Sequence, residues 1–242
     1  MNIKMNTISV IIPYYNNWFL THSRLGELQR FVPDPLEIIL VNDASPDLDC
    51  HTMPAFWQKL NIQHEIKYVR NQENLGFGGS HNRGAKAATG DILVFLSNDV
   101  VMSGNIILPI SQTIKENNGE VIVGGKVLYY DTGWNTLMLN GKPSIIPYPE
   151  GWLIVCTRDV WKRIGGWDAK TYGRYDFEDV DIGAWAMYND MKIVGLNLPF
   201  VNHLFGQTVS LVTNNREAQT KINQQKFRNK WTEKLQAKFG KG

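Results

Sequence analysis

The side chains of this chain that are best suited to catalysis or metal binding lie in two short acidic segments and at one later histidine. Asp99 ends the segment Ser97-Asn98-Asp99, directly after the apolar run 92–96, and Glu178 and Asp179 come ahead of His203. A carboxylate at the end of a buried strand is costly unless it binds a cation, pairs or takes part in a reaction. Asp99 and His203 could bind a metal ion, and Asp179 could act as a general base. This set suits cleavage of a sugar–diphosphate bond.

That reaction places definite demands on the side chains. Negative charge develops on the leaving diphosphate, and a divalent cation stabilises it. Carboxylate and phosphate oxygens suit a hard cation, and an added imidazole favours Mn²⁺. An acceptor hydroxyl is a weak nucleophile, so a carboxylate that removes its proton typically contributes about 10²–10⁴-fold to the rate. One base opposite the leaving group predicts inversion at the anomeric carbon.

Length and composition predict one sizeable globular core. The 242 residues carry a net charge of +2, which gives no overall attraction to nucleic acid. Cys50 and Cys156 lack metal-site spacing and are expected to be reduced thiols. The polar start 1–6 is unlike a signal sequence, and no apolar run approaches the roughly 18 residues that span a bilayer. We therefore expect a protein of the cytoplasm or of the inner face of the cell membrane.

Predicted strands and helices alternate through the first hundred residues. This order is typical of right-handed βαβ units, so we predict an α/β fold with a mostly parallel sheet flanked by helices. The predicted strands are 7–13, 36–41, 65–69 and 91–96, and the predicted helices are 18–31, 53–60 and 81–89.

The second half is less regular. We predict helices at 106–117, 159–164 and 179–189, strands at 121–124, 151–156 and 192–196, and a functional loop at 131–151, which is rich in Gly and Pro. No domain boundary is visible in the sequence. We expect one domain over 1–215, followed by a basic extension over 216–242.

A polar or glycine-bearing loop follows each of the first four predicted strands. Ligands of open α/β sheets bind at the carboxyl ends of the strands, so these loops predict a nucleotide-sized site. His81 occupies the place of the last glycine of a GxGxxG pattern, so a dinucleotide fingerprint is absent. For Asp43 alone, a plain turn or cap residue is an alternative. The loops are 13–16, 42–45, 74–78 and 97–99.

An ordered set of motifs resembles the family 2 glycosyltransferases, which have the GT-A fold. The similarity runs from about Ile8 to about Gly206, and Asn98-Asp99-Val100 with Gly165-Gly166-Trp167-Asp168 most resembles the rhamnosyltransferase-like branch. The other matching segments are 9–16, 41–47, 74–76, 82–84, 96–100, 178–181 and 203–206.

The resemblance implies a nucleotide-binding half at about 1–100 and an acceptor and catalytic half, with a smaller acceptor-side subregion, at about 101–215. Within the first half, Asp43 would hydrogen-bond uracil or thymine, and Gly76 would let the backbone approach the nucleotide. The expected nucleotide-binding residues are Pro13, Tyr14, Asn16, Asp43, Asn74, Gly76, Asn82, Arg83 and Asn98.

The resemblance also implies roles for the acidic residues. Asp99 matches the last acid of the family's DXD motif and would bind Mn²⁺ or Mg²⁺, with His203 as a second ligand. Asp179 matches the base of the ED motif, and Glu178 would hydrogen-bond a sugar. Ser97 occupies the position where the motif often has its first acid, so we expect the cation to arrive with the diphosphate. Asp181 is interpreted as structural, as a cap or a partner of an arginine.

Aromatic residues near the loop 131–151 are candidates for the acceptor side. Sugar rings stack on aromatic faces, and the sequence favours Trp152 and then Trp134 for this role, with Tyr148 weighed beside them. The alternative is simple packing of the subregion. Trp161 and Trp167 are expected in the core.

The basic extension carries an apolar residue at every fourth position, namely Phe227, Trp231, Leu235 and Phe239. This spacing predicts an amphipathic helix. The helix could pack on the domain, bind a membrane that bears a lipid-linked acceptor, or attract nucleic acid, which is less favoured.

The leading interpretation is an inverting, metal-dependent glycosyltransferase. It would use a UDP- or dTDP-sugar donor and a carbohydrate or lipid-linked acceptor, in polysaccharide or glycolipid synthesis. One alternative keeps the chemistry and changes the acceptor to a modified nucleic-acid base or a protein. Another is a nucleotide-sugar- or carbohydrate-binding module without turnover.

Overall fold

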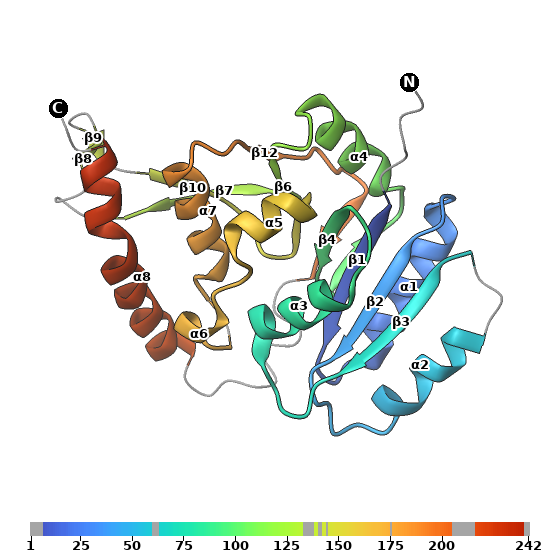
Figure 1. Ribbon diagram of the computed structural model, residues 1–242. Coiled ribbons are helices and arrows are strands. Elements are labelled where there is room, and N and C mark those ends of the chain that lie inside the picture. Colours follow the sequence, from blue (N-terminus) through green and yellow to red (C-terminus); the bar gives the residue numbers. More distant parts are fainter. Residues whose placement is uncertain are drawn as a thin grey trace.

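The chain folds around one central sheet with helices on both faces (Figure 1). The computed structural model describes residues 7–59, 63–132, 138–139, 142–143, 145–174, 176–204 and 216–239. Within these residues the sheet has seven strands in the order β12-β6-β11-β4-β1-β2-β3. The strands are β1 (Ile8–Tyr14), β2 (Glu37–Asn42), β3 (Glu65–Arg70), β4 (Ile92–Leu96), β6 (Ile122–Gly124), β11 (Leu153–Thr157) and β12 (Ile193–Gly195).

Strands β1 to β4 pair in parallel, and β12 pairs in parallel with β6, whereas β11 runs antiparallel between β4 and β6. The predicted α/β fold with a mostly parallel sheet is therefore confirmed. The carboxyl ends of β1, β2 and β4 lie at one edge, where Tyr14 pairs with Asn42 and Leu96 leads into Ser97. Their near-continuous apolar runs fit a sheet that is covered on both faces.

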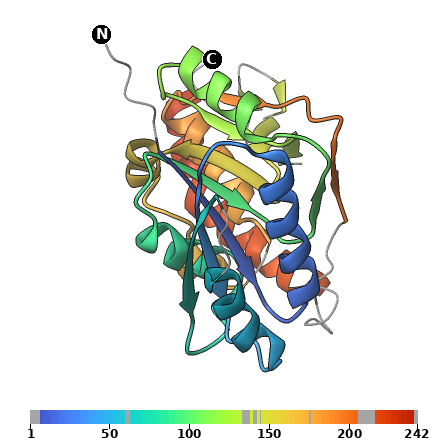
Figure 2. The ribbon, with the colours of Figure 1, turned by 90° about the vertical axis from the view of Figure 1, so that its right-hand side faces the viewer.

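Alternation along each strand assigns its side chains to the two faces. Val10 and Ile12 pack with α1 (Trp18–Phe31), α2 (Asp49–Lys59) and α4 (Ile107–Glu116). Ile11 packs with the opposite layer, formed by α3 (Gly76–Ala87), α5 (Arg158–Ile164) and α7 (Glu178–Tyr188). Figure 2 shows the sheet between α1 on one side and α3 on the other.

The helix α8 (Arg216–Phe239) adds a further layer outside α7 (Figure 1). Phe227, Trp231 and Leu235 are buried in a cluster with residues of α7 and the short helix α6 (Ala169–Tyr172). The apolar stripe predicted for the extension therefore packs on the protein, as the first of its alternatives proposed. None of the helices in the described residues has the length and apolar character needed to cross a bilayer.

Two expectations about elements were wrong, and one strand pair was missed. Helix α3 begins at Gly76 rather than at residue 81, so the glycine-rich segment is helical. Part of the expected loop 131–151 is a hairpin: β7 (Val127–Asp131) pairs with β10 (Ile145–Pro149), and two short strands, β8 (Met138–Leu139) and β9 (Lys142–Pro143), lie between them. Pro147 and Pro149 disfavour a central strand but fit this two-stranded ribbon. The pair β5 (Val100–Met102) and β13 (Val201–His203) was not predicted.

Two helical glycines should respond oppositely to alanine. A Cβ at Gly84 of α3 would lie 2.3 Å from Ile11 Cγ2 and 3.0 Å from Val41 Cγ2, whereas a Cβ at exposed Gly26 of α1 would meet nothing within 4 Å. We expect Gly84→Ala to lower the free energy of unfolding by about 1–3 kcal/mol. Gly26→Ala should raise it by up to about 1 kcal/mol through helix propensity. Urea unfolding measures both, and equal effects would show that α3 does not pack on the sheet as described.

Candidate active site

Asp99 and His203 are brought together by the pairing of β5 with β13. His203 lies opposite Val100 in this ladder, and Leu204 N–H donates to the Asp99 carbonyl at 3.0 Å. The two side chains meet with His203 Nε2 3.3 Å from Asp99 Oδ1. Asp99 is 7% exposed. Residues separated by about a hundred positions in sequence therefore form one polar pair.

The spacing of this pair fits two ligands of one cation. Adjacent ligands of an octahedral Mg²⁺ or Mn²⁺ are about 3 Å apart at metal–ligand distances of about 2.1 Å. No group of three or more His, Cys, Asp or Glu side chains suited to a metal occurs in the described residues. A cation held here would therefore depend on phosphate or water oxygens to complete its coordination.

Trp152 lies against the histidine of this pair. Its ring stacks on His203 with centroids 5.9 Å apart and an interplanar angle of 28°, and its Nε1–H donates to Glu150 at 2.9 Å. A Cβ at Gly125 would lie 2.1 Å from the indole, so only glycine fits beneath the ring. Trp152 is 8% exposed, which leaves little surface for a sugar. Trp152 thus supports the His203 ring, and its buried position does not support the acceptor role expected for it. Trp134, the other aromatic residue expected on the acceptor side, lies outside the described residues.

Helix α1 supplies partners for the Asp99 loop that the sequence analysis missed. Thr21 Oγ1 accepts a hydrogen bond from Asn98 Nδ2 at 3.2 Å, so the buried Asn98 is tied to α1. Arg24, which is 3% exposed, pairs with Glu27 at 2.7 Å. Burial lowers the pKa of Arg24, while the charges of Glu27 and Asp99 oppose that shift. The signal available in the sequence was a charged pair three residues apart on an otherwise apolar helix face.

Asp179 sits in the first turn of α7, beside the start of β11. Its Oδ2 accepts a hydrogen bond from Gly151 N–H at 3.2 Å, and its Oδ1 accepts one from Val180 N–H at 2.8 Å. Burial among protein atoms raises the pKa of Asp179 to about 6, although these two amides favour the charged form. By its surface area the residue is only partly buried. A carboxylate with this pKa is ionised at neutral pH and able to take a proton.

Gly151 and Trp152 are adjacent in the chain, and their contacts connect the two acidic positions. Gly151 contacts Asp179, and Trp152 contacts His203, which in turn lies beside Asp99. The three side chains singled out first in the sequence are therefore connected through the two residues that precede β11.

Glu178 is placed differently from its expected role. The side chain is 3% exposed, and its Oε1 lies near Gly78 in the first turn of α3. Burial raises the pKa of Glu178 to about 8, and the neighbouring charge of Asp179 adds to the rise. Glu178 is thus a buried neutral acid at pH 7, and the expectation that it hydrogen-bonds a sugar is not supported by its position.

Tyr148 of β10 is the aromatic residue of the hairpin that approaches the proposed base. Burial raises the pKa of its hydroxyl to about 12, and the nearby charges of Asp179 and Glu150 contribute. The approach depends on Gly183 of α7, where a Cβ would lie 2.6 Å from Tyr148 Cβ. Among the aromatic residues weighed for the acceptor side, Tyr148 is therefore one whose hydroxyl is influenced by the charge of Asp179.

The backbone is strained where β1 and β2 end. Asn16, Asn17 and Ala44 have positive φ angles of 52°, 49° and 59°. Such conformations cost about 1–3 kcal/mol each and cluster at functional sites. Asn16 N–H donates to Ser45 Oγ at 2.9 Å, and the buried Asn16 Oδ1 has no hydrogen-bond partner among the described residues. Asn16 is therefore well placed to meet a ligand at this edge.

Asp43 holds the loop that leads into α3. Its Oδ1 accepts hydrogen bonds from Leu75 N–H at 2.7 Å and Asn71 Nδ2 at 2.8 Å, and its Oδ2 accepts one from Gly76 N–H at 2.9 Å. Asp43 is 4% exposed. Asp43 thus stabilises a turn, as the alternative proposed. This role is compatible with a hydrogen bond to a nucleotide base.

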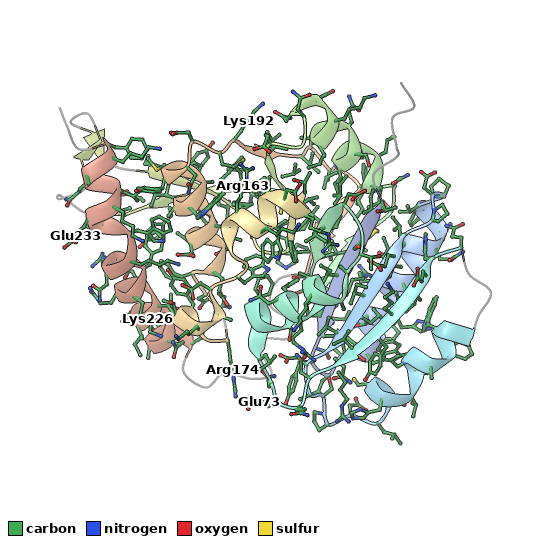
Figure 3. The ribbon with its side chains drawn as sticks, viewed as in Figure 1. Glu73, Arg163, Arg174, Lys192, Lys226 and Glu233 are labelled. Carbon is green, nitrogen blue, oxygen red and sulfur yellow. The ribbon has the colours of Figure 1, made fainter. Side chains whose placement is uncertain are left out.

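Glycine is required at position 76 by contacts within the protein, independently of any nucleotide. Gly76 has φ of +72°, and a Cβ there would lie 2.3 Å from Arg174 Cα. Phe77 N–H donates to the Arg174 carbonyl at 2.9 Å, and Asn74 Oδ1 accepts from Gly76 N–H at 3.1 Å. Figure 3 shows the exposed Arg174 and Glu73 at the same lower edge of the molecule.

Two expected nucleotide contacts are corrected. Tyr14 is 2% exposed, packs edge-on against Trp18 at 5.3 Å, and donates its hydroxyl to the Cys50 carbonyl at 2.8 Å, so its ring cannot line a nucleotide pocket. Asn82 donates to the Trp167 carbonyl at 2.8 Å and accepts from Trp167 N–H at 2.9 Å. Its amide therefore fixes the Gly-Gly-Trp-Asp segment.

The other expectations have mixed outcomes. Pro13 is partly exposed at the end of β1, and Arg83 is exposed on α3. Trp161 and Trp167 lie in the core as predicted. Asp181 is structural, but it pairs with Lys230 at 2.8 Å rather than with an arginine.

Comparison with known proteins places these features in a family. The sequence model described as "Glycosyl transferase family 2" matches residues 9–188. "Glycosyltransferase GlyG" of Streptococcus pneumoniae is 24% identical over 128 residues, which cover 53% of this chain and 42% of that protein. The chain thus spans less than half the length of this curated relative.

Solved structures share the fold. The mannosyltransferase PcManGT from Pyrobaculum calidifontis, in complex with GDP-Man and Mn²⁺, matches with a TM-score of 0.60 and 18% identity, covering 80% of this chain and 55% of that chain. GalNAc-T7 with UDP, GalNAc and Mn²⁺ matches with a TM-score of 0.66 and 16% identity, covering 82% and 43%. The expected GT-A fold is therefore confirmed.

Burial of Glu178 predicts that the free energy of unfolding falls as the pH rises, and that replacement by glutamine removes this fall. The pKa of Glu178 rises from an ordinary 4.5 to about 8 in the folded chain. As the pH rises through this window, the unfolded chain releases a proton that the folded chain keeps, so the stability contributed by Glu178 falls. Glutamine is neutral in both states. We therefore expect the free energy of unfolding of Glu178→Gln, relative to wild type, to increase from pH 5 to pH 8 in urea titrations.

The matched control is Glu73→Gln, which changes an exposed glutamate. Its difference from wild type should be nearly constant over the same pH range. A constant difference for Glu178→Gln as well would show that Glu178 is ionised in the folded protein.

Proposed function

Because this chain belongs to glycosyl transferase family 2, we propose that it transfers a sugar from a nucleotide-sugar donor to an acceptor hydroxyl, with inversion at the anomeric carbon. The observation that carries the proposal is the series of contacts that connects the Asp99–His203 pair to Asp179 through Trp152 and Gly151, just before β11. A cation-binding pair beside a carboxylate with a pKa of about 6 is the arrangement that such a displacement needs.

Asp179 is the proposed general base. Its carboxylate is held by the amides of Gly151 and Val180 and keeps an accessible surface from which it can take the acceptor proton. As the acceptor oxygen loses its proton to Asp179, it attacks the anomeric carbon, and the bond to the diphosphate breaks on the opposite face. One base and no enzyme nucleophile correspond to a single displacement, which inverts the configuration.

Asp99 and His203 are the proposed metal ligands, for Mn²⁺ or Mg²⁺. When bound, the cation would stabilise the negative charge that develops on the leaving diphosphate. The oxygen and nitrogen donors of this pair fit Mn²⁺ best. Trp152 holds the His203 ring by stacking, and α1 holds the Asp99 loop through Thr21.

The nucleotide is proposed to bind at the carboxyl ends of β1 and β2. Asn16 Oδ1, which has no hydrogen-bond partner within the described part of the chain, and the partly exposed Pro13 are available there. Asp43 fixes the loop that would lie over the base. A UDP- or dTDP-sugar donor and a rhamnosyltransferase-like specificity are proposed from the motifs around Asn98-Asp99-Val100. UDP is also bound by GalNAc-T7, whereas PcManGT binds GDP-Man.

Two regions divide this work in the proposal. Residues 1–100 bind the nucleotide, and residues 101–215 provide the base and the acceptor side. Tyr148 belongs to β10 of the hairpin, and the charge of Asp179 contributes to the raised pKa of its hydroxyl, which supports Tyr148 as an acceptor contact. The acceptor is proposed to be a carbohydrate or a lipid-linked sugar of a polysaccharide or glycolipid.

Replacing the proposed base tests the chemistry directly. Asp179→Asn removes the proton acceptor and keeps the shape, so we expect kcat to fall by at least about 10²-fold while nucleotide affinity is kept. In the wild type, kcat should fall as the pH drops through about 6, because a protonated Asp179 cannot accept the proton. Nucleotide release on donor turnover, followed by a coupled assay, measures both. Full activity of the asparagine variant would remove Asp179 from this role, and a wild type that binds nucleotide sugars without turnover would indicate a binding module.

Metal dependence is tested with donor and cation together. A thermal-shift screen of nucleotide sugars should show a larger rise in Tm with Mn²⁺ than without it, because both ligands bind the native state. EDTA should stop transfer, and Asp99→Asn should raise the Mn²⁺ concentration needed for half-maximal rate. Exposed Asp159→Asn is the control for a change of surface charge. Transfer at full rate in EDTA would exclude a metal requirement.

A further inference from the structure

The segment that carries Asp179 enters α7 through a strained turn. Asp176 and Phe177 have φ angles of 70° and 80°, and neither is glycine. Side chains disfavour this left-handed region, and each such residue costs about 1–3 kcal/mol, so surrounding contacts must hold it. Glu178 and Asp179 follow immediately, so the turn sets the direction in which the proposed base points.

The contacts that hold this turn come from α8. Thr220 Oγ1 donates to Asp176 Oδ2 at 2.6 Å, and Arg216 Nη2 donates to Asp176 Oδ1 at 2.9 Å. Asn223, which is fully buried, donates from Nδ2 to the Asp176 carbonyl at 3.1 Å and to the Tyr172 carbonyl at 2.8 Å. One face of α8 thus donates hydrogen bonds to both the side chain and the backbone of Asp176.

Aromatic packing also stabilises this turn. The Phe227 ring of α8 lies 5.6 Å from the Phe177 ring and 5.6 Å from the Tyr130 ring of β7. Phe227 is fully buried, and Phe177 is 8% exposed. A left-handed Phe177 is therefore wedged between the hairpin and α8.

A second anchor lies just beyond the base. Asp181, 7% exposed in the first turn of α7, accepts hydrogen bonds from Trp231 Nε1 at 2.6 Å and from Tyr172 Oη at 2.8 Å, and it pairs with Lys230 at 2.8 Å. Lys230 also pairs with Asp168 at 2.7 Å. Removing a partner of a buried carboxylate leaves it poorly compensated, which costs more than the loss of an exposed pair.

The polar contacts of α8 therefore flank Asp179 on both sides in sequence, at residue 176 and at residue 181. Figure 3 shows Lys226 on the part of α8 beside α6, where its Nζ donates to the Thr171 carbonyl at 2.7 Å. The opposite end of α8 contacts the end of α7 through an exposed ion pair, Lys238 with Asp190 at 2.6 Å. A helix that merely covered apolar surface would not require a buried amide and an indole N–H aimed at the segment that carries the base.

We propose that α8 is a positioning element of the active site, in which Asn223, Lys230 and Trp231 fix the turn before α7 and the first turn of α7 so that Asp179 points at the acceptor. The inference rests on the proposed function of Asp179. It assigns Lys226 and Lys230, two of the basic residues of the extension, to intramolecular contacts. Asn223, Lys230 and Trp231 act through Asp176 and Asp181 and do not touch substrate.

The test compares variants at the two ends of α8. Trp231→Phe keeps an aromatic ring and removes the N–H that Asp181 accepts, and Asn223→Ala removes the donor to the Asp176 carbonyl. We expect each to lower kcat about 10- to 100-fold, because small displacements of a reacting group have effects of this size. The KM for the donor and the Kd for UDP or dTDP in MnCl₂, measured by calorimetry, should stay within about twofold, because the nucleotide site lies on other elements.

Lys238→Met is the matched control, since it removes an ion pair of the same helix far from the turn. It should keep the wild-type kcat. Lys230→Met should lower kcat, and Lys230→Arg should restore most of it, because arginine can still pair with Asp168 and Asp181. The Tm of each variant shows whether it folds. If Trp231→Phe or Asn223→Ala does not fold, the comparison of kcat between Lys230→Met and Lys230→Arg tests the proposal.

The outcomes separate the two levels of proposal. A wild type without transfer overturns the proposed function and this inference with it. A wild type that transfers sugar, together with folded Trp231→Phe and Lys230→Met variants that match Lys238→Met in kcat, overturns the inference alone. A loss of kcat that is matched by an equal loss of UDP affinity also overturns it, since the defect would then be general.

Discussion

The hydrogen bond from Gly151 N–H to the Asp179 carboxylate joins the two halves of the candidate site. It ties the first turn of α7 to the turn that precedes β11, and the next residue of that turn, Trp152, supports His203 beside Asp99. A carboxylate buried among protein atoms needs such a donor to remain charged. This contact is the hydrogen bond that links the element carrying the proposed base to the residues beside the metal pair.

The arrangement concentrates unfavourable conformations at the places where function is proposed. Among the described non-glycine residues, positive φ angles occur at Asn16, Asn17 and Ala44 beside the nucleotide edge and at Asp176 and Phe177 before the base, and otherwise only at Asn118 and Asp190, which follow α4 and α7. Contacts from another segment hold Asn16 through Ser45 and Asp176 through Asn223. Strain that is maintained by tertiary contacts can hold reacting groups in directions that a relaxed backbone would not give them.

Several polar residues that looked free to bind a ligand are used by the fold. Asn82 spans the backbone of Trp167, Asp43 caps the loop into α3, and Glu178 is a buried acid near Gly78. These residues match family motifs because the motifs include the supports of the site as well as its reacting groups. A sequence pattern cannot separate the two classes, since both need particular polar atoms at fixed positions.

The sequence by itself determined the α/β class, the parallel strands β1 to β4, the buried stripe of α8, and Asp99, Asp179 and His203 as candidates, because local periodicity and motif order are properties of neighbouring residues. Only the tertiary structure decided that Tyr14 turns into the core, that Trp152 supports His203, and that α8 grips the turn before Asp179. These outcomes depend on packing and hydrogen bonds between residues tens of positions apart. Their geometry is fixed by the whole fold and leaves no local signal in the chain.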